Sequence, residues 1–172
     1  MFIKYIKGLS VKKLLKSTLK HANINTFSTP IQTVGIIIDE SYFKSKEQLK
    51  QLIIQNGIKE NNIKILTFKD KIKSSNVHDE STFSNKNMNW KGVFKKDFIN
   101  EFINTPFDIL ISYYDVEKAP LLVITHNSRA NFKVGISKVD IRLNHLMINT
   151  TVENYAIFTE ELFKYLKILK KI

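Results

Sequence analysis

Residues 33–39 read TVGIIID and residues 107–114 read FDILISYY, and these two apolar runs decide the fold. The first run is rich in β-branched residues and lacks alternation between apolar and polar positions, which is typical of a strand buried on both faces. Shorter strand-like runs follow at residues 63–68 (IKILTF), 132–136 (FKVGI) and 145–151 (HLMINTT). Helix-like stretches separate the runs at residues 41–57, 95–105 and 118–129, and another closes the chain at 153–172. Strands that alternate with helices predict βαβ units and a parallel sheet covered by helices on both faces.

The bulk composition fits one folded domain. With 172 residues, of which 43% are hydrophobic, the chain can bury a substantial core. We predict one α/β domain at residues 31–172 with a mainly parallel sheet of four or five strands. Gly57 is expected to end the first helix of this domain, and the polar stretch at residues 68–94 is expected to be irregular. Cysteine is absent, which excludes disulfides, thiolate metal sites and a cysteine nucleophile.

The charge balance favours anionic partners. Lysine and arginine outnumber aspartate and glutamate by 27 to 16, which gives a formal net charge of +11. Such a surplus favours nucleic acids, phosphates or anionic membrane surfaces. The codon bias of an AT-rich genome is an alternative explanation, because lysine, isoleucine and asparagine dominate while arginine occurs only at Arg129 and Arg142.

The sequence predicts a cytoplasmic protein. No stretch of 18 uncharged apolar residues occurs, so no membrane-spanning segment is expected. Lysines are scattered through the apolar residues of MFIKYIKGLSVKKLLK at residues 1–16, which is unlike a secretory signal.

The first 30 residues form a predicted basic extension, composed of an amphipathic helix and a linker. They contain no acidic residue and six lysines: Lys4, Lys7, Lys12, Lys13, Lys16 and Lys20. Apolar residues recur at helical spacing between these lysines, so one face of the helix is apolar and the other is cationic. Such a helix can bind phosphates, pack on its own domain, lie on an anionic membrane or dock on a partner protein.

The carboxyl ends of the predicted strands carry the candidate ligand pocket. Open parallel sheets bind ligands beyond these ends. The residues expected there are Asp39, Tyr113, Tyr114 and Asp115. Asp39 and Asp115 can form a carboxylate pair for acid–base work, or each can be an ordinary residue of a turn or helix cap.

The sequence lacks the common motifs of cofactor and hydrolase sites. Neither GxGxxG nor GxxxxGK[ST] occurs, which argues against ordinary nucleotide binding. The four histidines lack metal-ligand spacing, and no GxSxG motif is present. We therefore expect no cofactor, no metal site and no catalytic residue.

The stretch NKNMNWKGVF at residues 85–94 interleaves aromatic residues with lysines. Trp90 can stack on an unpaired base if it is exposed. Alternatively, Trp90 anchors the long polar connection to the domain.

Two resemblances accompany these observations. The first resemblance rests on four segments: VGIII (34–38), FDILISYY (107–114), FKVGI (132–136) with the following Asp140 and Arg142-Leu143-Asn144, and LFKYLKILKKI (162–172). These segments resemble an uncharacterised family of short proteins from Bacteroidetes bacteria. That family implies no activity. The second resemblance rests on VGI, FDILI, the turn Ser128-Arg129-Ala130 and FKVGI. Together these resemble the amino-terminal, Rossmann-like half of heptosyltransferase-type glycosyltransferases. This second resemblance implies a single Rossmann-like domain, and it argues against transferase activity because the half that binds the nucleotide sugar is missing.

The function that we predict is non-enzymatic RNA binding, at the ribosome. The six lysines of the basic extension would contact phosphates, which position a protein without reading sequence. Second-rank phosphate contacts are Lys95, Lys96, Arg129 and Lys133. The first alternative is a degenerate glycosyltransferase-like domain that binds a small anionic ligand or nucleotide sugar in the pocket, and the second is a peripheral membrane or scaffold protein that uses the basic helix.

Overall fold

The strands form one parallel sheet with a doubly wound order. The computed structural model describes residues 13, 30–71 and 81–172. The strands are β1 (Val34–Asp39), β2 (Ile63–Phe68), β3 (Thr82–Phe83), β4 (Ile109–Tyr113), β5 (Phe132–Ile136) and β6 (Leu146–Ile148). Their order in the sheet is β3-β2-β1-β4-β5-β6, and every neighbouring pair is parallel. The chain winds outward in one direction from β1 and in the other from β4, as in Rossmann-like folds.

This arrangement confirms the predicted α/β fold class, with one difference in the number of strands. The sheet has six strands, whereas the sequence predicted four or five. The additional strand is β3, which consists of only Thr82 and Phe83 and follows the polar part of the chain. Two residues are too few to produce a periodic pattern, so the strand could be found only through its pairing with the end of β2.

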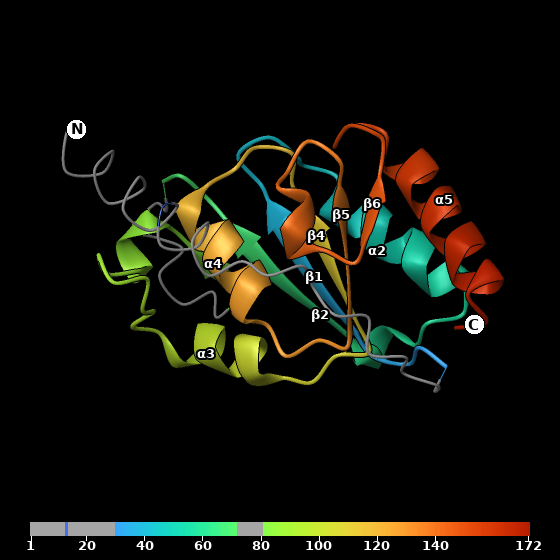
Figure 1. Ribbon diagram of the computed structural model, residues 1–172, viewed down its shortest axis with the longest axis horizontal. Coiled ribbons are helices and arrows are strands. Elements are labelled where there is room, and N and C mark those ends of the chain that lie inside the picture. The colour runs from blue at the N-terminus through green and yellow to red at the C-terminus, as the bar shows by residue number, and fades with distance from the viewer. Residues whose placement is uncertain (1–12, 14–29, 72–80) are drawn as a thin grey trace.

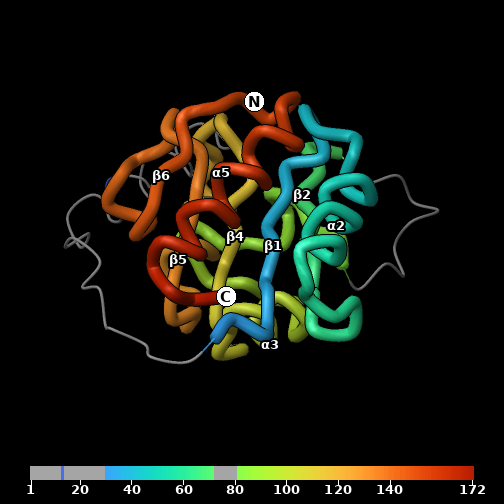
Figure 2. Tube along the Cα trace, turned by 90° about the vertical axis from the view of Figure 1, so that its right-hand side faces the viewer, coloured from blue at the N-terminus to red at the C-terminus, as the bar shows by residue number. Residues whose placement is uncertain are grey.

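Helices cover both faces of the sheet (Figures 1 and 2). They are α2 (Lys46–Gln55), α3 (Asp97–Asn104), α4 (Ala119–Asn127) and α5 (Tyr155–Ile168), with short 3-10 helices η1 (Glu60–Asn62), η3 (Asn85–Asn87) and η4 (Ile141–Leu143). Helices α2 and α5 lie side by side on one face, and α3 and α4 cover the other. Gly57 follows α2 with φ of +97°, a conformation that costs glycine little, so the predicted helix end is confirmed.

Side chains of the central strands alternate between two hydrophobic cores. In β1, Ile36 and Ile38 point into the core beneath α2 and α5, whereas Ile37 points into the core beneath α3 and α4. All six residues of β1 are buried, as its unbroken apolar run predicts. Gly35 is required because a Cβ at this position would approach the Phe107 ring to 2.6 Å.

The strand register places the ends of β1, β2 and β4 together. Asp39 pairs with Phe68 of β2, and Ile38 pairs with Tyr113 of β4. The loops that follow these strands therefore begin at one edge of the sheet. No helix within the described residues is long and apolar enough to cross a membrane. The predicted basic extension lies outside those residues except for Lys13 and Pro30, and Lys13 has helical backbone and an exposed side chain.

Candidate functional site

The carboxyl edge of the sheet, between β1 and β4, carries the residues of the predicted ligand pocket. The sheet order reverses there, and ligands of doubly wound sheets bind at such a point. Asp39 ends β1, and Tyr114 and Asp115 directly follow β4. We call the loops that leave this edge after β1, β2 and β4 the strand-end network.

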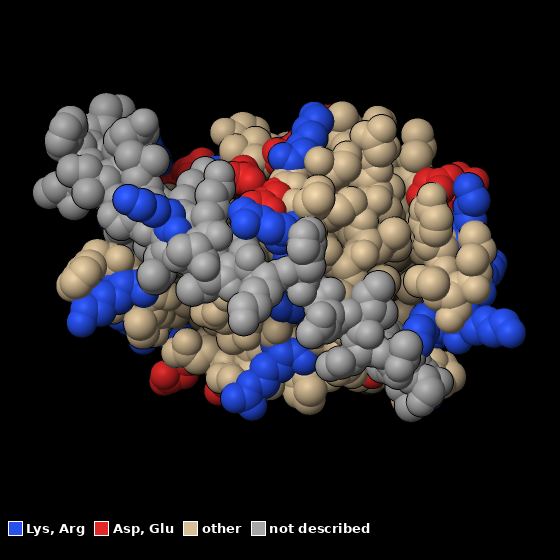
Figure 3. All heavy atoms as spheres, viewed as in Figure 1, with Lys and Arg blue, Asp and Glu red and all other residues tan. Residues whose placement is uncertain are grey.

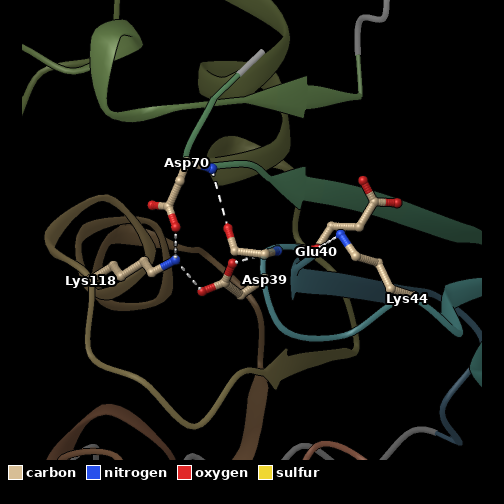
Figure 4. Close-up of polar contacts among 6 residues, drawn as sticks. Asp39, Glu40, Lys44, Asp70 and Lys118 are labelled. Atoms are coloured by element: carbon tan, nitrogen blue, oxygen red, sulfur yellow. Dashed lines mark hydrogen bonds and ion pairs between the residues drawn. The ribbon is translucent and has the colours of Figure 1, made fainter. Parts of the chain in front are cut away.

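An ion-pair cluster occupies the centre of the strand-end network (Figure 4). The Nζ atom of Lys118 lies 2.8 Å from Oδ2 of Asp39 and 2.9 Å from Oδ2 of Asp70. The same ammonium group lies 4.7 Å from the ring centroids of both Tyr42 and Phe68. Asp39 is 2% exposed, so its charge depends on Lys118 for compensation. The three charged groups come from three loops, which the cluster ties together.

The acidic side chain of Glu40, in the loop after β1, is also neutralised by lysines. Glu40 pairs with Lys69 at 2.6 Å and with Lys46 at 3.6 Å, and its backbone carbonyl accepts a hydrogen bond from Lys44 (Figure 4). Acidic and basic side chains also lie next to one another in the upper middle of Figure 3. Lys46, Lys69 and Lys118, three basic groups at this edge, are thus already paired with acidic groups of the protein.

The backbone of these loops lacks an anion cradle. Residues 40–45 and 114–118 contain no glycine, which a phosphate loop needs so that its amides can approach the anion. The Oδ1 atom of Asp39 instead accepts a hydrogen bond of 3.0 Å from the amide of Ser41. Asp39 therefore supplies from within the protein the negative charge that a bound phosphate would bring.

The structure places the two predicted carboxylates in separate ion pairs. Asp39 binds Lys118, whereas Asp115 lies 3.4 Å from Lys138. Each carboxylate thus has a lysine partner. This geometry gives no support to a shared-proton pair for acid–base chemistry.

Both tyrosines of the predicted pocket are completely buried, on opposite faces of the sheet. The hydroxyl of Tyr113 donates to the carbonyl of Val152 at 2.8 Å. The hydroxyl of Tyr114 lies 2.8 Å from Oγ1 of Thr125, which also bonds Ser112 at 3.1 Å. Burial raises the pKa of both phenols above its ordinary value, so both stay protonated at neutral pH. These contacts assign the tyrosines to the core, and the proposed ligand pocket remains a prediction without geometric support.

Lys133 and Arg129, two of the residues predicted as second-rank phosphate contacts, lie outside the strand-end network. The Nζ atom of Lys133 donates to the carbonyls of Thr125 (2.7 Å) and His126 (3.0 Å) at the carboxyl end of α4. Burial lowers the pKa of Lys133 to about 8. Its ammonium group is therefore bound to carbonyl groups at the end of α4 and is largely shielded from solvent. Arg129 is exposed, but its amide bonds the carbonyl of Ile103, which places it near the end of α3 remote from Lys96.

Lys95 and Lys96 belong to a second candidate site, which we call the basic hairpin (residues 84–96). This segment follows β3 and contains four lysines, Lys86, Lys91, Lys95 and Lys96, and no acidic residue. All four side chains are exposed. No salt bridge joins any of them to an acidic side chain among the residues that the structure describes. Lysine or arginine side chains project from the left end of the molecule in Figure 3, where Figure 1 places the segment before α3.

Two buried side chains anchor the basic hairpin. Met88 and Phe94 form an antiparallel bridge, and both belong to the core beneath α3 and α4. The Phe94 ring makes an edge contact with Phe83 at a centroid distance of 6.2 Å. The anchoring role that the sequence offered to Trp90 thus belongs to Met88 and Phe94.

The tip of the basic hairpin holds Trp90 in the open. Oδ1 of Asn89 accepts hydrogen bonds from the amides of Lys91 and Val93, each 2.9 Å long, and Gly92 adopts φ of +81°. Trp90 is 69% exposed and Val93 is 56% exposed. The Lys91 ammonium lies 5.1 Å from the centre of the indole ring. The tip is therefore an ordered turn that presents an indole and a cation to solvent.

Sequence reasoning missed the most connected residue of the strand-end network. Lys118 was expected only as the first residue of the helix-like stretch at residues 118–129, and Asp70 only as part of the irregular polar stretch at residues 68–94. The available signal was the position of Lys118 just after a strand end that neighbours the end of β1, because a buried aspartate there needs a cation. No group of three or more metal-ligating side chains occurs in the described part of the chain.

Comparisons with known proteins give a family and no activity. The model of a family of unknown function (DUF6913) matches residues 7–169. No curated protein and no solved structure matches the sequence. The resemblance to an uncharacterised family is confirmed, whereas the Bacteroidetes origin and the resemblance to glycosyltransferases remain predictions.

Proposed function

The chain belongs to the DUF6913 family of unknown function, and from its structure we propose that it is a non-enzymatic RNA-binding protein. The basic hairpin would contact phosphates, together with the lysines of the amino-terminal extension. Ribosomal RNA is the partner that we would test first. The contacts would hold RNA by its backbone rather than by its sequence.

One observation carries this proposal: the lysines of the basic hairpin have no acidic partner in the described structure. At the strand-end network, Lys118 and Lys69 each pair with a carboxylate, and Lys138, which follows β5, pairs with Asp115 of the network. Unpaired lysines can neutralise RNA phosphates, and the RNA then releases the cations that were condensed on it, which favours binding. The part of the surface with unpaired lysines is therefore better suited to RNA than the strand-end network is.

The placement of these lysines adds to the argument. Lys95 and Lys96 immediately precede α3, and Lys86 lies in η3. Lys91 lies in the turn between them. Anchoring by Met88 and Phe94 holds all four on one short segment, so they can engage neighbouring phosphates of one strand.

A charge-matched pair of variants tests the proposal on the full-length chain. The triple variant K91Q/K95Q/K96Q removes three charges from the basic hairpin, and K59Q/K64Q/K167Q removes three exposed lysines elsewhere. Binding of a single-stranded RNA 12-mer is measured by fluorescence anisotropy at several salt concentrations. We expect wild-type affinity to fall with salt and the hairpin variant to lower the logarithmic salt slope by about 2, at about 0.7 for each lost contact.

The control variant should keep a slope close to that of the wild type. An equal loss in both variants would mean that only net charge matters, and it would overturn the assignment to the basic hairpin. A second measurement addresses the partner: sedimentation of the native protein from a gentle lysate, at low and high salt, with and without RNase. Comigration with ribosomes that high salt abolishes supports ribosomal RNA, and migration as a small free protein under every condition contradicts it.

A further inference from the structure

We propose that Trp90 is a stacking platform for an unpaired base, so that the protein binds single-stranded rather than duplex RNA. This inference rests on the proposed RNA-binding function and names the substrate class of the same site. Phosphate contacts alone do not distinguish single strands from duplexes. An exposed aromatic ring does, because a base can reach it only after leaving its own stack.

Trp90 exposes a large ring on an ordered turn. Trp90 is the only tryptophan in the chain and is 69% exposed, although a smaller residue would make the same turn. The turn itself is held by Asn89 and Gly92, and the hairpin is anchored by Met88 and Phe94. Neither the turn nor the anchor uses the indole, so folding gives no reason for a tryptophan at this position.

A cation and an apolar side chain lie next to the Trp90 ring. Lys91 lies over the indole at 5.1 Å, a distance at which a cation is attracted to an aromatic face. An indole has two faces, so one can carry the lysine while the other receives a base. Val93, 56% exposed on the same turn, extends the apolar surface beside the ring. Together they offer apolar contact for a base and positive charge for the phosphates on either side of it.

The surrounding charge selects the occupant. Residues 84–96 carry four positive charges and no negative charge, which complements a polyanion. A patch with only two large exposed apolar residues is small for a protein–protein core, which buries many more. A nucleotide strand needs only one ring for each stacked base, and sites on single-strand binders combine such rings with basic grooves.

The single tryptophan provides a site-specific probe. Because the chain has no other tryptophan, its tryptophan fluorescence, excited selectively over the tyrosines, reports on this ring alone. Three probes of equal length are compared: a 12-mer of oligoadenylate, the same backbone without bases, and a 12-base-pair RNA duplex. The variants are Trp90→Ala, which removes the platform, and Trp90→Phe, which keeps a ring. Because the side chain is exposed, both should fold, which thermal unfolding verifies.

We expect the oligoadenylate to quench Trp90 fluorescence and to bind more tightly than the abasic strand and the duplex. By anisotropy, Trp90→Ala should lose roughly tenfold or more in affinity for the oligoadenylate, and Trp90→Phe should keep most of it. The abasic strand should bind the wild type and Trp90→Ala equally, since only phosphate contacts remain.

The outcomes separate this inference from the function on which it rests. If oligoadenylate and abasic strands bind alike and fluorescence does not change, the stacking platform is wrong while RNA binding stands. Tighter binding of the duplex would also overturn the platform. If no strand binds the wild type at low salt, the proposed function fails as well. Vesicles of phosphatidylcholine with one quarter phosphatidylglycerol test the remaining occupant: a blue shift of Trp90 with vesicles, without quenching by RNA, would assign the tip to a membrane surface.

Discussion

The strand-end network and the basic hairpin leave the same edge of the sheet, but their lysines differ in ion pairing and in exposure. Lys118, whose side chain is 14% exposed, lies between Asp39, Asp70 and two aromatic rings. The lysines of the basic hairpin are exposed and have no acidic partner in the described structure. A charge surplus counted along the sequence therefore says little about where a polyanion binds. What matters is which charges are left after internal pairing.

This difference also explains why a Rossmann-like fold need not bind a nucleotide. An anionic ligand at the strand-end network would have to displace Asp39 from Lys118 and leave that buried carboxylate without compensation. Such displacement is costly because a buried charge without a partner loses solvation and gains nothing in return. At the basic hairpin, a ligand displaces only water and counterions.

The largest effect is expected from breaking the strand-end network with Lys118→Met. Removing the ammonium leaves Asp39 buried without a cation, and such losses destabilise proteins by about 3–5 kcal/mol. Chemical denaturation measures the change in the free energy of unfolding. Affinity for RNA, measured well below the unfolding transition, should not change.

Two further variants show whether burial is the cause of that effect. Lys138→Met breaks the pair with Asp115, in which the lysine is 53% exposed, and should cost less than about 1 kcal/mol. Adding Asp39→Asn to Lys118→Met removes the uncompensated charge and should recover part of the loss. Equal destabilisation by Lys118→Met and Lys138→Met would contradict the description of Lys118 as the centre of the network.

The sequence determined the fold more fully than the site, for physical reasons. The strands β1, β2, β4 and β5 are short, mainly apolar runs, and each has the length that a buried strand requires. Such patterns are local, so they can be recognised without knowing the neighbours. Strand β3 was missed because its two residues carry no pattern and depend on β2 for pairing.

The contacts of the candidate site were harder to predict because they join residues that are distant in the sequence. Asp39 was correctly expected at the strand end, but its partner Lys118 is 79 positions later and only the fold brings them together. The tyrosines were expected near a ligand because their chain position is at the end of β4. Their alternating directions bury both, and only the hydroxyl contacts with Val152 and Thr125 show where they point.

Lys133 sharpens the comparison, because it has no acidic partner among the described residues and its amine is largely buried. Its pKa is lowered from 10.5 to about 8 by burial. Between those values the unfolded chain binds the proton and the folded chain does not, so stability from this group rises as pH rises from about 8 to 10.5. Relative to Lys133→Met, the wild type should gain roughly 1–2 kcal/mol over that range, discounted for the partial exposure of the amine.

NMR titration of the lysine side chains provides an independent measurement. The Lys133 signal should shift with a midpoint near pH 8, well below the ordinary pKa of a lysine, about 10.4. The hydrogen bonds from Lys133 to the end of α4 are lost in the variant at every pH, so only the pH dependence is informative. A Lys133 midpoint at the ordinary value for lysine would show that its amine is solvated.

The smallest effect is expected at the tip of the basic hairpin, from Asn89→Ala. This change removes the acceptor for the amides of Lys91 and Val93 but leaves Trp90 and every charge in place. Because the turn is exposed, overall stability should fall by about 1 kcal/mol or less. RNA affinity should fall roughly two- to fivefold, since binding must then order a looser turn. Anisotropy of the oligoadenylate complex measures this loss, and Asn104→Ala, an exposed amide at the end of α3, is the matched control. Unchanged affinity in Asn89→Ala would mean that the lysines bind without a preformed tip, and the comparison would then reduce to charge alone.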